Sequence, residues 1–162
     1  TPALMPALAD YAPIRPVRGQ ALLLRATPPP VSHIVKWQRG YIVPWTADTA
    51  AVGSTTDRRS GLDQSVTAGG LHEVMGKALA IAPALAAAGV LKTWAGLRPA
   101  PLDQRPIMGP IPGVEGLFAA AGHYKIGFGF APRCAELMAA MIAHAQTPEG
   151  AAAFLPRRTQ SA

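Results

Sequence analysis

Short apolar runs separated by proline and glycine dominate the first third of the chain and limit what it can form. The run Ala21–Leu24 is followed by three consecutive prolines, which supply no backbone donor to a strand ladder. Three more short runs lie at Ile34–Trp37, Tyr41–Pro44 and Ala50–Gly53. Runs of this length with turn residues between them are typical of antiparallel strands. We therefore predict an antiparallel sheet over Val17–Thr56.

A helix is predicted after this sheet. Thr67 can cap its start, and Pro83 is expected to end or kink it. Between them, apolar residues recur at three- and four-residue spacings, at Leu71, Val74, Met75 and Leu79. The segment Val90–Arg98 then returns to an extended pattern that contains Trp94. These features predict a sheet with one covered face.

The later part of the chain has the pattern of a strand, a glycine loop and a helix. Glycine lies at each end of the apolar run 116–122, which resembles a buried strand and leads into the loop His123–Gly129. Pro132 is predicted at the start of a helix that carries an apolar stripe to about Ala145. The segment 147–162 is predicted to be a tail, polar and frayed from Phe154 onward.

Composition limits the class of protein. The chain has 162 residues, of which 49% are hydrophobic and 15% charged, so it has the material for a packed core and suits one domain or part of a larger fold. Its net charge is +6, from 15 basic and 9 acidic residues, but the basic residues are scattered and do not predict nucleic-acid binding. No apolar stretch is long enough for a membrane helix and no signal peptide is visible, so we expect a cytoplasmic protein.

Metal binding and disulfides are not expected. Cys134 is the single cysteine, which excludes an internal disulfide and any zinc site with several cysteines. The histidines show no spacing for a shared ion; they are His33, His72, His123 and His144. We therefore predict no metal site.

Three local features could carry chemistry. Glycines at 122, 127 and 129 would let a ligand approach the backbone, and the following helix would direct its N–H groups there; a tight turn without a ligand is the alternative. Arg98 follows Gly96 and Leu97, and its forked guanidinium matches the two oxygens of a carboxylate; a surface arginine after a strand is the alternative. Tyr41 could hold a substrate with its hydroxyl, or pack as an ordinary half-buried strand residue.

Six short motifs, taken in order, resemble the glycine oxidase and D-amino-acid oxidase family of flavoproteins. The resemblance extends from Ile14 to Ala145 and matches the second half of such an enzyme, without the N-terminal dinucleotide fingerprint. The motifs are Pro16–Val17–Arg18–Gly19–Gln20, Tyr41–Ile42–Val43–Pro44, Val52–Gly53–Ser54–Thr55, Trp94–Ala95–Gly96–Leu97–Arg98–Pro99, Pro106–Ile107–Met108–Gly109, and Gly116–Leu117–Phe118 leading to Gly122–His123–Tyr124.

The resemblance implies roles for individual residues. Arg98 would pair with a substrate carboxylate, Tyr41 would line the substrate pocket, and Lys125 would also lie near the substrate. FAD is implied as the cofactor, bound non-covalently, since Cys134 is not at the position where relatives attach flavin. No catalytic side chain is assigned. The implied cofactor-binding residues are Gly96, Leu97, Gly122, His123, Tyr124, Lys125, Ile126, Gly127 and Phe128. Lys125–Ile126 replaces the Arg-Asn pair of glycine oxidase-like relatives, which leaves the substrate open.

The implied fold class is α+β or α/β, with an antiparallel substrate-domain sheet plus the last strand and C-terminal helix of a Rossmann-like FAD domain. Residues 1–16 would lead in from an N-terminal half, 17–98 would form the substrate-binding sheet with its helix, 99–146 would return to the FAD-binding domain, and 147–162 would be the tail. The expected partners are an N-terminal FAD-binding chain or fragment of the same enzyme and a small amine or amino-acid substrate. The expected reaction is oxidation of an amine C–N bond by hydride transfer to flavin.

Two other functions are open from the sequence. The chain begins at Thr1, so an N-terminal-threonine hydrolase is conceivable, in which the free amine activates the hydroxyl. The second is a non-enzymatic basic binding module, whose binding to nucleic acid would weaken with salt.

Overall fold

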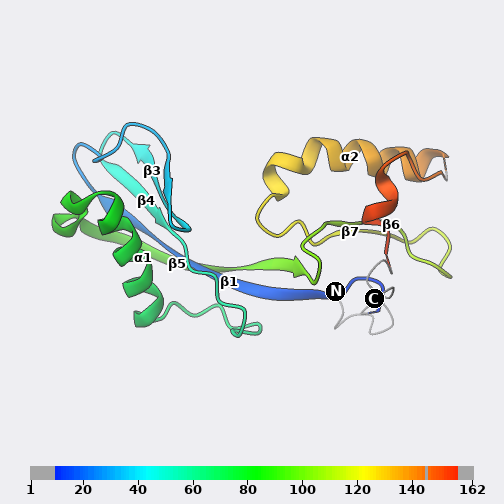
Figure 1. Cartoon of the computed structure of the whole chain (residues 1–162), viewed down its shortest axis with the longest axis horizontal. Helices are drawn as coiled ribbons and strands as arrows, with labels where there is room; N and C mark the ends of the chain where they lie inside the picture. Colours follow the sequence, from blue (N-terminus) through cyan, green and yellow to red (C-terminus); the bar gives the residue numbers. More distant parts are fainter. Residues whose placement is uncertain (1–9, 145, 157–162) are drawn as a thin grey trace. The chain divides into compact units, whose positions relative to one another are not determined.

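The computed structural model describes residues 10–144 and 146–156, which divide into two compact units (Figure 1). We call residues 17–97 the sheet unit, and the described residues before Val17 and after Leu97 the helix unit. The predicted lead-in falls largely on residues 1–9, which, like Thr1 itself, lie outside the described residues. None of the described helices is long and apolar enough to cross a membrane.

A five-stranded sheet with the order β2-β3-β4-β1-β5 forms the framework of the sheet unit. The pairs β2–β3, β3–β4 and β1–β4 are antiparallel, as the short apolar runs predict. The strands are β1 (Ile14–Arg25), β2 (Val35–Trp37), β3 (Gly40–Thr46), β4 (Thr49–Gly53) and β5 (Gly89–Pro101). Strand β1 is longer than its apolar run, because Arg18 and Gln20 are strand residues whose side chains form hydrogen bonds inside the protein.

Helix α1 (Ala68–Ile81) confirms the predicted helix and both of its boundaries. The Thr67 hydroxyl accepts a hydrogen bond from the Gly70 amide at 3.1 Å, and Pro83 opens the short 3-10 helix η2 (Pro83–Ala87). The side chain of Gln20 accepts a hydrogen bond from the Thr67 amide at 2.7 Å, so β1 fixes the start of α1. One strand residue therefore determines where this helix lies on the sheet.

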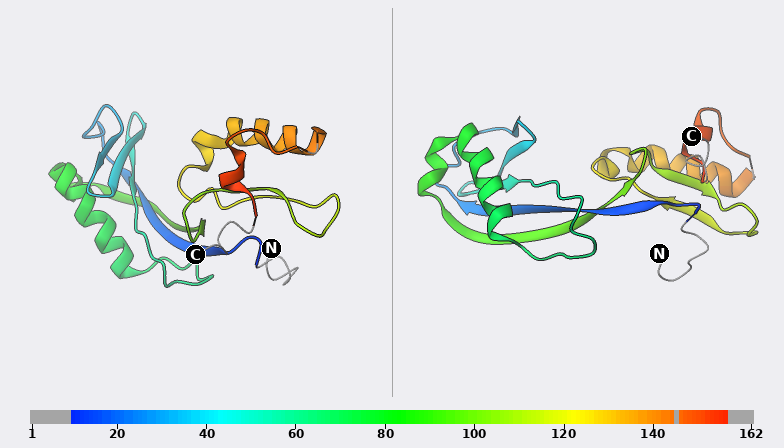
Figure 2. Two further views of the ribbon diagram at one scale, coloured as in Figure 1. Left: turned by 45° about the vertical axis from the view of Figure 1, so that its right-hand side comes forward. Right: turned by 60° about the horizontal axis from the view of Figure 1, so that its bottom comes forward.

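The core of the sheet unit lies between α1 and one face of the sheet (Figures 1 and 2). The strands contribute Leu22, Leu24, Ile42 and Val52, and the helical segments contribute Val74, Ala78 and Leu85. Since side chains alternate along a strand, the neighbours of these residues point to the opposite face of the sheet. Tyr41, next to the buried Ile42, is one of them.

The helix unit contains a two-stranded antiparallel sheet and the long helix α2. Its elements are β6 (Ile107–Pro110), β7 (Phe118–Ala121), α2 (Gly127–His144) and the 3-10 helix η3 (Ala151–Phe154). Met108 pairs with Ala120 across the two strands. The core of this unit joins β6, α2 and η3 through Met108, Cys134, Leu137, Met141 and Ala151.

The start of α2 corrects the prediction that placed a helix start at Pro132. The helix begins at Gly127, and the amide of Phe130 already donates to the carbonyl of Ile126 at 3.1 Å. Pro132 lies inside the helix, where only the hydrogen bond to the Phe128 carbonyl is lost. Gly127 and Gly129 therefore belong to the first turn of the helix and not to the loop before it. Ala145, the predicted end of the helix, lies outside the described residues.

Two further predictions in this unit are wrong. Strand β7 is not fully buried, because Ala120 is exposed and its neighbours are half-buried. The segment from Phe154 is not frayed as far as Pro156, since Phe154 and Leu155 pack against the core and Pro156 is buried. Apolar contacts hold this segment, and residues 157–162 of the predicted tail lie outside the described residues.

Candidate functional site

The loop between β7 and α2 is held against the last residues of β5. The amide of Tyr124 donates a hydrogen bond to the Pro99 carbonyl at 3.1 Å. Gly122 has a φ of 75°, and a Cβ at this position would overlap the side chain of Pro101. Only glycine meets both conditions without strain. The helix unit thus brings the loop next to the segment that carries Arg98.

The backbone of this loop is strained at one residue. Tyr124 has a φ of 48°, in the left-handed region that non-glycine residues seldom occupy. Such a conformation costs about 1–3 kcal/mol, and residues strained in this way cluster at functional sites. The Ile126 amide donates to the His123 carbonyl at 3.0 Å, and the ammonium of Lys125 lies 5.2 Å from the centre of the Tyr124 ring. These contacts hold the loop in its conformation.

The first turn of α2 offers its backbone to a ligand. The first amides of a helix have no partner within the helix and form its positive end. No acidic residue lies in the first turn, a Cβ on Gly129 would contact nothing, and the Phe128 side chain is fully exposed. The loop and this turn therefore fit a group that is anionic or electron-rich, as the ring of a flavin is when reduced. His123 and Ile126 complete the predicted cofactor-binding residues of this loop.

Arg98 is a half-buried residue of β5 in the helix unit. Gly96 and Leu97 precede it on the same strand but belong to the sheet unit; Gly96 is exposed and Leu97 is half-buried. The structure therefore brings Arg98 close in the fold to the predicted loop residues, through the adjacent Pro99.

Tyr41 lies in the sheet unit, on the face opposite α1. It is directly opposite Gly53 of β4 and Lys36 of β2. A Cβ on Gly53 would overlap the ring and hydroxyl of Tyr41, so the ring lies across this glycine. The glycine of the Val52–Gly53–Ser54–Thr55 motif is thus what allows the tyrosine to lie flat on the sheet.

A buried arginine cluster was not predicted from the sequence. Arg18 is 7% exposed, and its guanidinium pairs with Asp63 and, at 2.9 Å, with Asp57. The pKa of Asp57 is lowered by the Arg59 amide and by Arg18, and the pKa of Asp63 is lowered by the amide and hydroxyl of Ser65 and by Arg18. The cluster fastens the polar segment 57–65 to β1. The signal in the sequence was an arginine within an apolar strand followed by two aspartates in a polar link.

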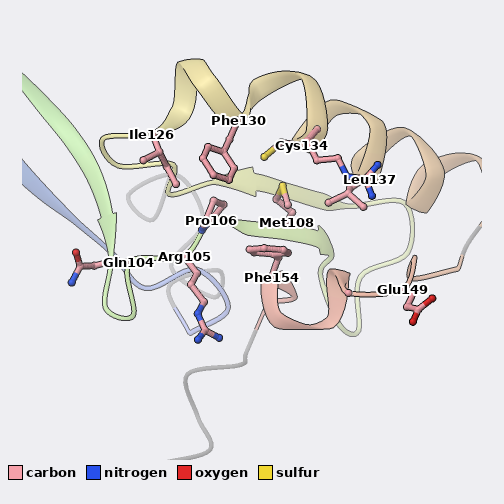
Figure 3. A pocket seen from close by; sticks show the side chains of 12 residues that line it. Gln104, Arg105, Pro106, Met108, Ile126, Phe130, Cys134, Leu137, Glu149 and Phe154 are labelled. Carbon is pink, nitrogen blue, oxygen red and sulfur yellow. The ribbon is translucent and has the colours of Figure 1, made fainter.

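A cavity of about 350 Å³ lies in the helix unit (Figure 3). Phe130 and Cys134 of α2 point toward Met108 of β6, with Phe154 of η3 on the other side, whereas Glu149 points outward. Burial raises the pKa of the Cys134 thiol, as expected for a packing residue with little thiolate character. The lining is mainly apolar, and Gln104, Arg105, Arg133 and Glu149 add polar and charged groups to it.

Metal ligands are not gathered at any of these places. Among residues 10–144 and 146–156, no group of three or more His, Cys, Asp or Glu side chains is arranged to hold an ion.

Comparison with known proteins places these features in a family. The family model described as DAO, FAD dependent oxidoreductase, matches residues 1–141. Glycine oxidase from Pseudomonas putida is 32% identical over 153 residues, which is 94% of this chain and 42% of that protein. Glycine oxidase from Geobacillus kaustophilus has a similar structure, with a TM-score of 0.83 and 30% identity over 97% of this chain and 42% of that chain. Iminodiacetate oxidase from Chelativorans sp. BNC1 gives a TM-score of 0.82 and 30% identity over 95% and 43%.

The chain thus spans about two fifths of the length of these relatives. The match covers both the sheet unit and the loop that precedes α2. Family, fold class and sequence motifs agree, so the resemblance noted from the sequence is confirmed: the chain belongs to the DAO family of FAD-dependent oxidoreductases.

Proposed function

We propose that this chain is part of an amine or amino-acid oxidoreductase that removes a hydride from the carbon next to the amine nitrogen. The observation that supports this most is the hydrogen bond from the Tyr124 amide to the Pro99 carbonyl. It holds a strained glycine loop beside the strand that carries Arg98, which couples a cofactor loop to a carboxylate-binding residue. The family match favours this function over a Thr1 hydrolase or a basic binding module.

FAD, when bound, supplies the acceptor for the two electrons that leave the substrate as a hydride. In this proposal residues 122–128 contact the flavin, and the start of α2 together with Lys125 stabilises its negative charge. Binding is non-covalent, since Cys134 is buried in the core of the helix unit. The remaining three fifths of the relatives' length would supply the nucleotide-binding portion, on a separate chain or fragment.

The substrate would be held by its carboxylate and its body. Arg98 donates two parallel hydrogen bonds to the carboxylate, and Tyr41 contacts the substrate with its ring and hydroxyl. The product imine is hydrolysed by water to a carbonyl compound and ammonia or an amine. No side chain needs to act as a base if the amine binds in its neutral form. Substrates of the relatives named above, glycine and iminodiacetate, are the first to test.

The test uses the FAD-loaded enzyme that contains this chain. Arg98→Met is expected to lower kcat/KM for glycine at least about 100-fold, because two charge-assisted hydrogen bonds are lost. Arg133→Met is the control, since Arg133 is exposed in the same unit and, among the described residues, its ion pair is with Glu136 at the surface. Loss of the visible absorbance of the flavin on anaerobic addition of substrate reports the chemical step. Unchanged affinity of Arg98→Met for a substrate would show that the carboxylate lies elsewhere.

A further inference from the structure

Strand β5 lies at one end of the five-stranded sheet. The sheet order places β1 on one side of β5 and no described strand on the other, and the right-hand view of Figure 2 shows β5 in green beside β1 in blue. We call the side of residues 89–95 that faces away from β1 the outer edge of β5; these residues belong to the sheet unit. The backbone N–H and C=O groups along such an edge can pair with a further strand.

Large apolar side chains are exposed along this segment. Val90 is 58% exposed, Leu91 43% and Trp94 39%. Val90 and Leu91 are consecutive in a strand, so they project from opposite faces of the sheet. The core beneath α1 takes side chains from β1, β3 and β4, but none from residues 89–95. Apolar residues on both faces are typical of a strand that is covered on both faces.

The opposite end of the sheet is built differently. Strand β2 has three residues, and Lys36 is the middle one. Short length and lysine residues are two of the features that keep an edge strand from pairing with another strand. Strand β5 has 13 residues, and its segment 89–95 contains no proline and one lysine, Lys92. The sheet is thus closed at β2 and open at β5.

We propose that the sheet continues beyond β5 with a strand from the remaining portion of the enzyme. This inference rests on the proposed function, in which such a portion accompanies the chain. The chain spans about two fifths of the length of its relatives, so a portion of the missing size can pair with β5 and also cover both faces. A second copy of this chain, paired edge to edge, would extend the sheet but leave one face uncovered, because α1 covers a single face.

The pattern of exposed residues defines the kind of strand that fits. Val90 and Trp94 are four residues apart and project from one face, whereas Leu91 projects from the other. The added strand therefore carries apolar side chains on both faces beside these positions. Main-chain hydrogen bonds along the outer edge of β5 hold it in register.

Hydrogen exchange at single-residue resolution tests this on the complete enzyme, which is this chain together with the remaining portion. Alternate amides of a strand point to opposite edges, so about half of those in residues 90–95 face away from β1. We expect all of these amides to exchange at least about 100-fold more slowly than in an unfolded chain. Strand β2 is the internal control, and its outward amides should exchange fast. Fast exchange of every second amide in residues 90–95 would overturn the proposal.

A photo-cross-linker identifies the added strand. The variant Val90→benzoylphenylalanine, irradiated in the complete enzyme, should form its cross-link within the remaining portion, as mapped by mass spectrometry of peptides. A cross-link to β5 of a second copy would overturn the choice of occupant. A cross-link confined to this chain itself would overturn the added strand.

Two tryptophans give a matched pair of variants. Trp94→Lys puts a charge beside the added strand and should speed exchange of the outward β5 amides at least about tenfold. Trp37 is 55% exposed on β2, so Trp37→Lys should leave β5 exchange unchanged. Val90→Lys should act like Trp94→Lys, and it serves where the tryptophan variant does not fold. Unchanged β5 exchange in a folded Trp94→Lys or Val90→Lys variant would contradict the covered position given to these side chains.

These measurements do not depend on turnover, so they separate the two proposals. If the outer edge of β5 is protected and cross-links to the remaining portion while no amine reduces the flavin, the added strand stands and the proposed function fails. If amines reduce the flavin while the outward β5 amides exchange fast, the added strand fails and the oxidoreductase function stands.

Discussion

Helices α1 and α2 differ in how completely they bury their apolar side chains. Every large apolar residue of α1 is buried or half-buried against the sheet or η2. Helix α2 buries one stripe against β6 but leaves Phe128, Phe130 and Ile142 exposed. Thus the large apolar side chains of α1 are covered within the chain, whereas α2 leaves three large apolar side chains exposed among the described residues. The chain spans about two fifths of its relatives' length, which is consistent with this difference.

The strongest test of this difference truncates one isoleucine in the core beneath α1 and another on the exposed side of α2. Ile42→Ala in the core beneath α1 should lower the free energy of unfolding by about 2–5 kcal/mol, since a fully buried side chain leaves a cavity. Ile142→Ala on the exposed surface of α2 should change it by less than about 0.5 kcal/mol. Urea denaturation followed by circular dichroism measures both. Equal losses would mean that the surface of α2 is covered in solution.

A smaller effect on stability is expected from replacing Gly122 in the loop before α2. Gly122→Ala should cost about 1–3 kcal/mol, because alanine is strained at a φ of 75° and its Cβ overlaps Pro101. The same variant should weaken FAD binding, measured by the quenching of flavin fluorescence. Gly129→Ala is the control: it lies in the first turn of α2 with open space around it and should not destabilise the helix. A stable Gly122→Ala variant with normal FAD affinity would contradict the role given to this loop.

The smallest expected effect is on the pH dependence of stability, and it arises in the sheet unit alone. The pKa values of Asp57 and Asp63 are lowered below their ordinary value of 3.8, so their contribution to stability is complete above that pH. It is lost as the pH falls through the lowered values, when the carboxylates take up protons. We expect Asp57→Asn to give a shallower loss of stability between pH 5 and pH 2 than the wild type. Urea midpoints at a series of pH values measure this; parallel curves would show that Asp57 does not contribute.

Local signals in the sequence were sufficient for part of the fold. The strand runs, the Thr67 cap and the Pro83 boundary depend on residues close in the chain, and the structure confirms each of them. The start of α2 was misplaced because Pro132 is a good helix-start residue by local rules, while the glycines before it are not helix formers. For Phe154, contacts with residues distant in the sequence decided the result.

Only part of the candidate site could be predicted from the sequence. Glycine spacing and the family resemblance identified the loop, Arg98 and Tyr41 as candidates, and their roles stay predictions. The hydrogen bond between Tyr124 and Pro99 joins residues 25 positions apart (124 − 99), and no sequence pattern in either segment predicts it. The Arg18 cluster spans up to 47 positions, and Tyr41 acquires Gly53 as its neighbour only through the register of β3 and β4.

The hydrogen bond between Tyr124 and Pro99 has a mechanical consequence. Pro99 follows Arg98 directly in the chain, so one peptide unit and one hydrogen bond connect the arginine to Tyr124, three residues before the start of α2. Proline stiffens this connection, because its ring fixes the backbone φ at the residue that accepts the hydrogen bond. The backbone at Arg98 and the loop before α2 are therefore restrained to move together.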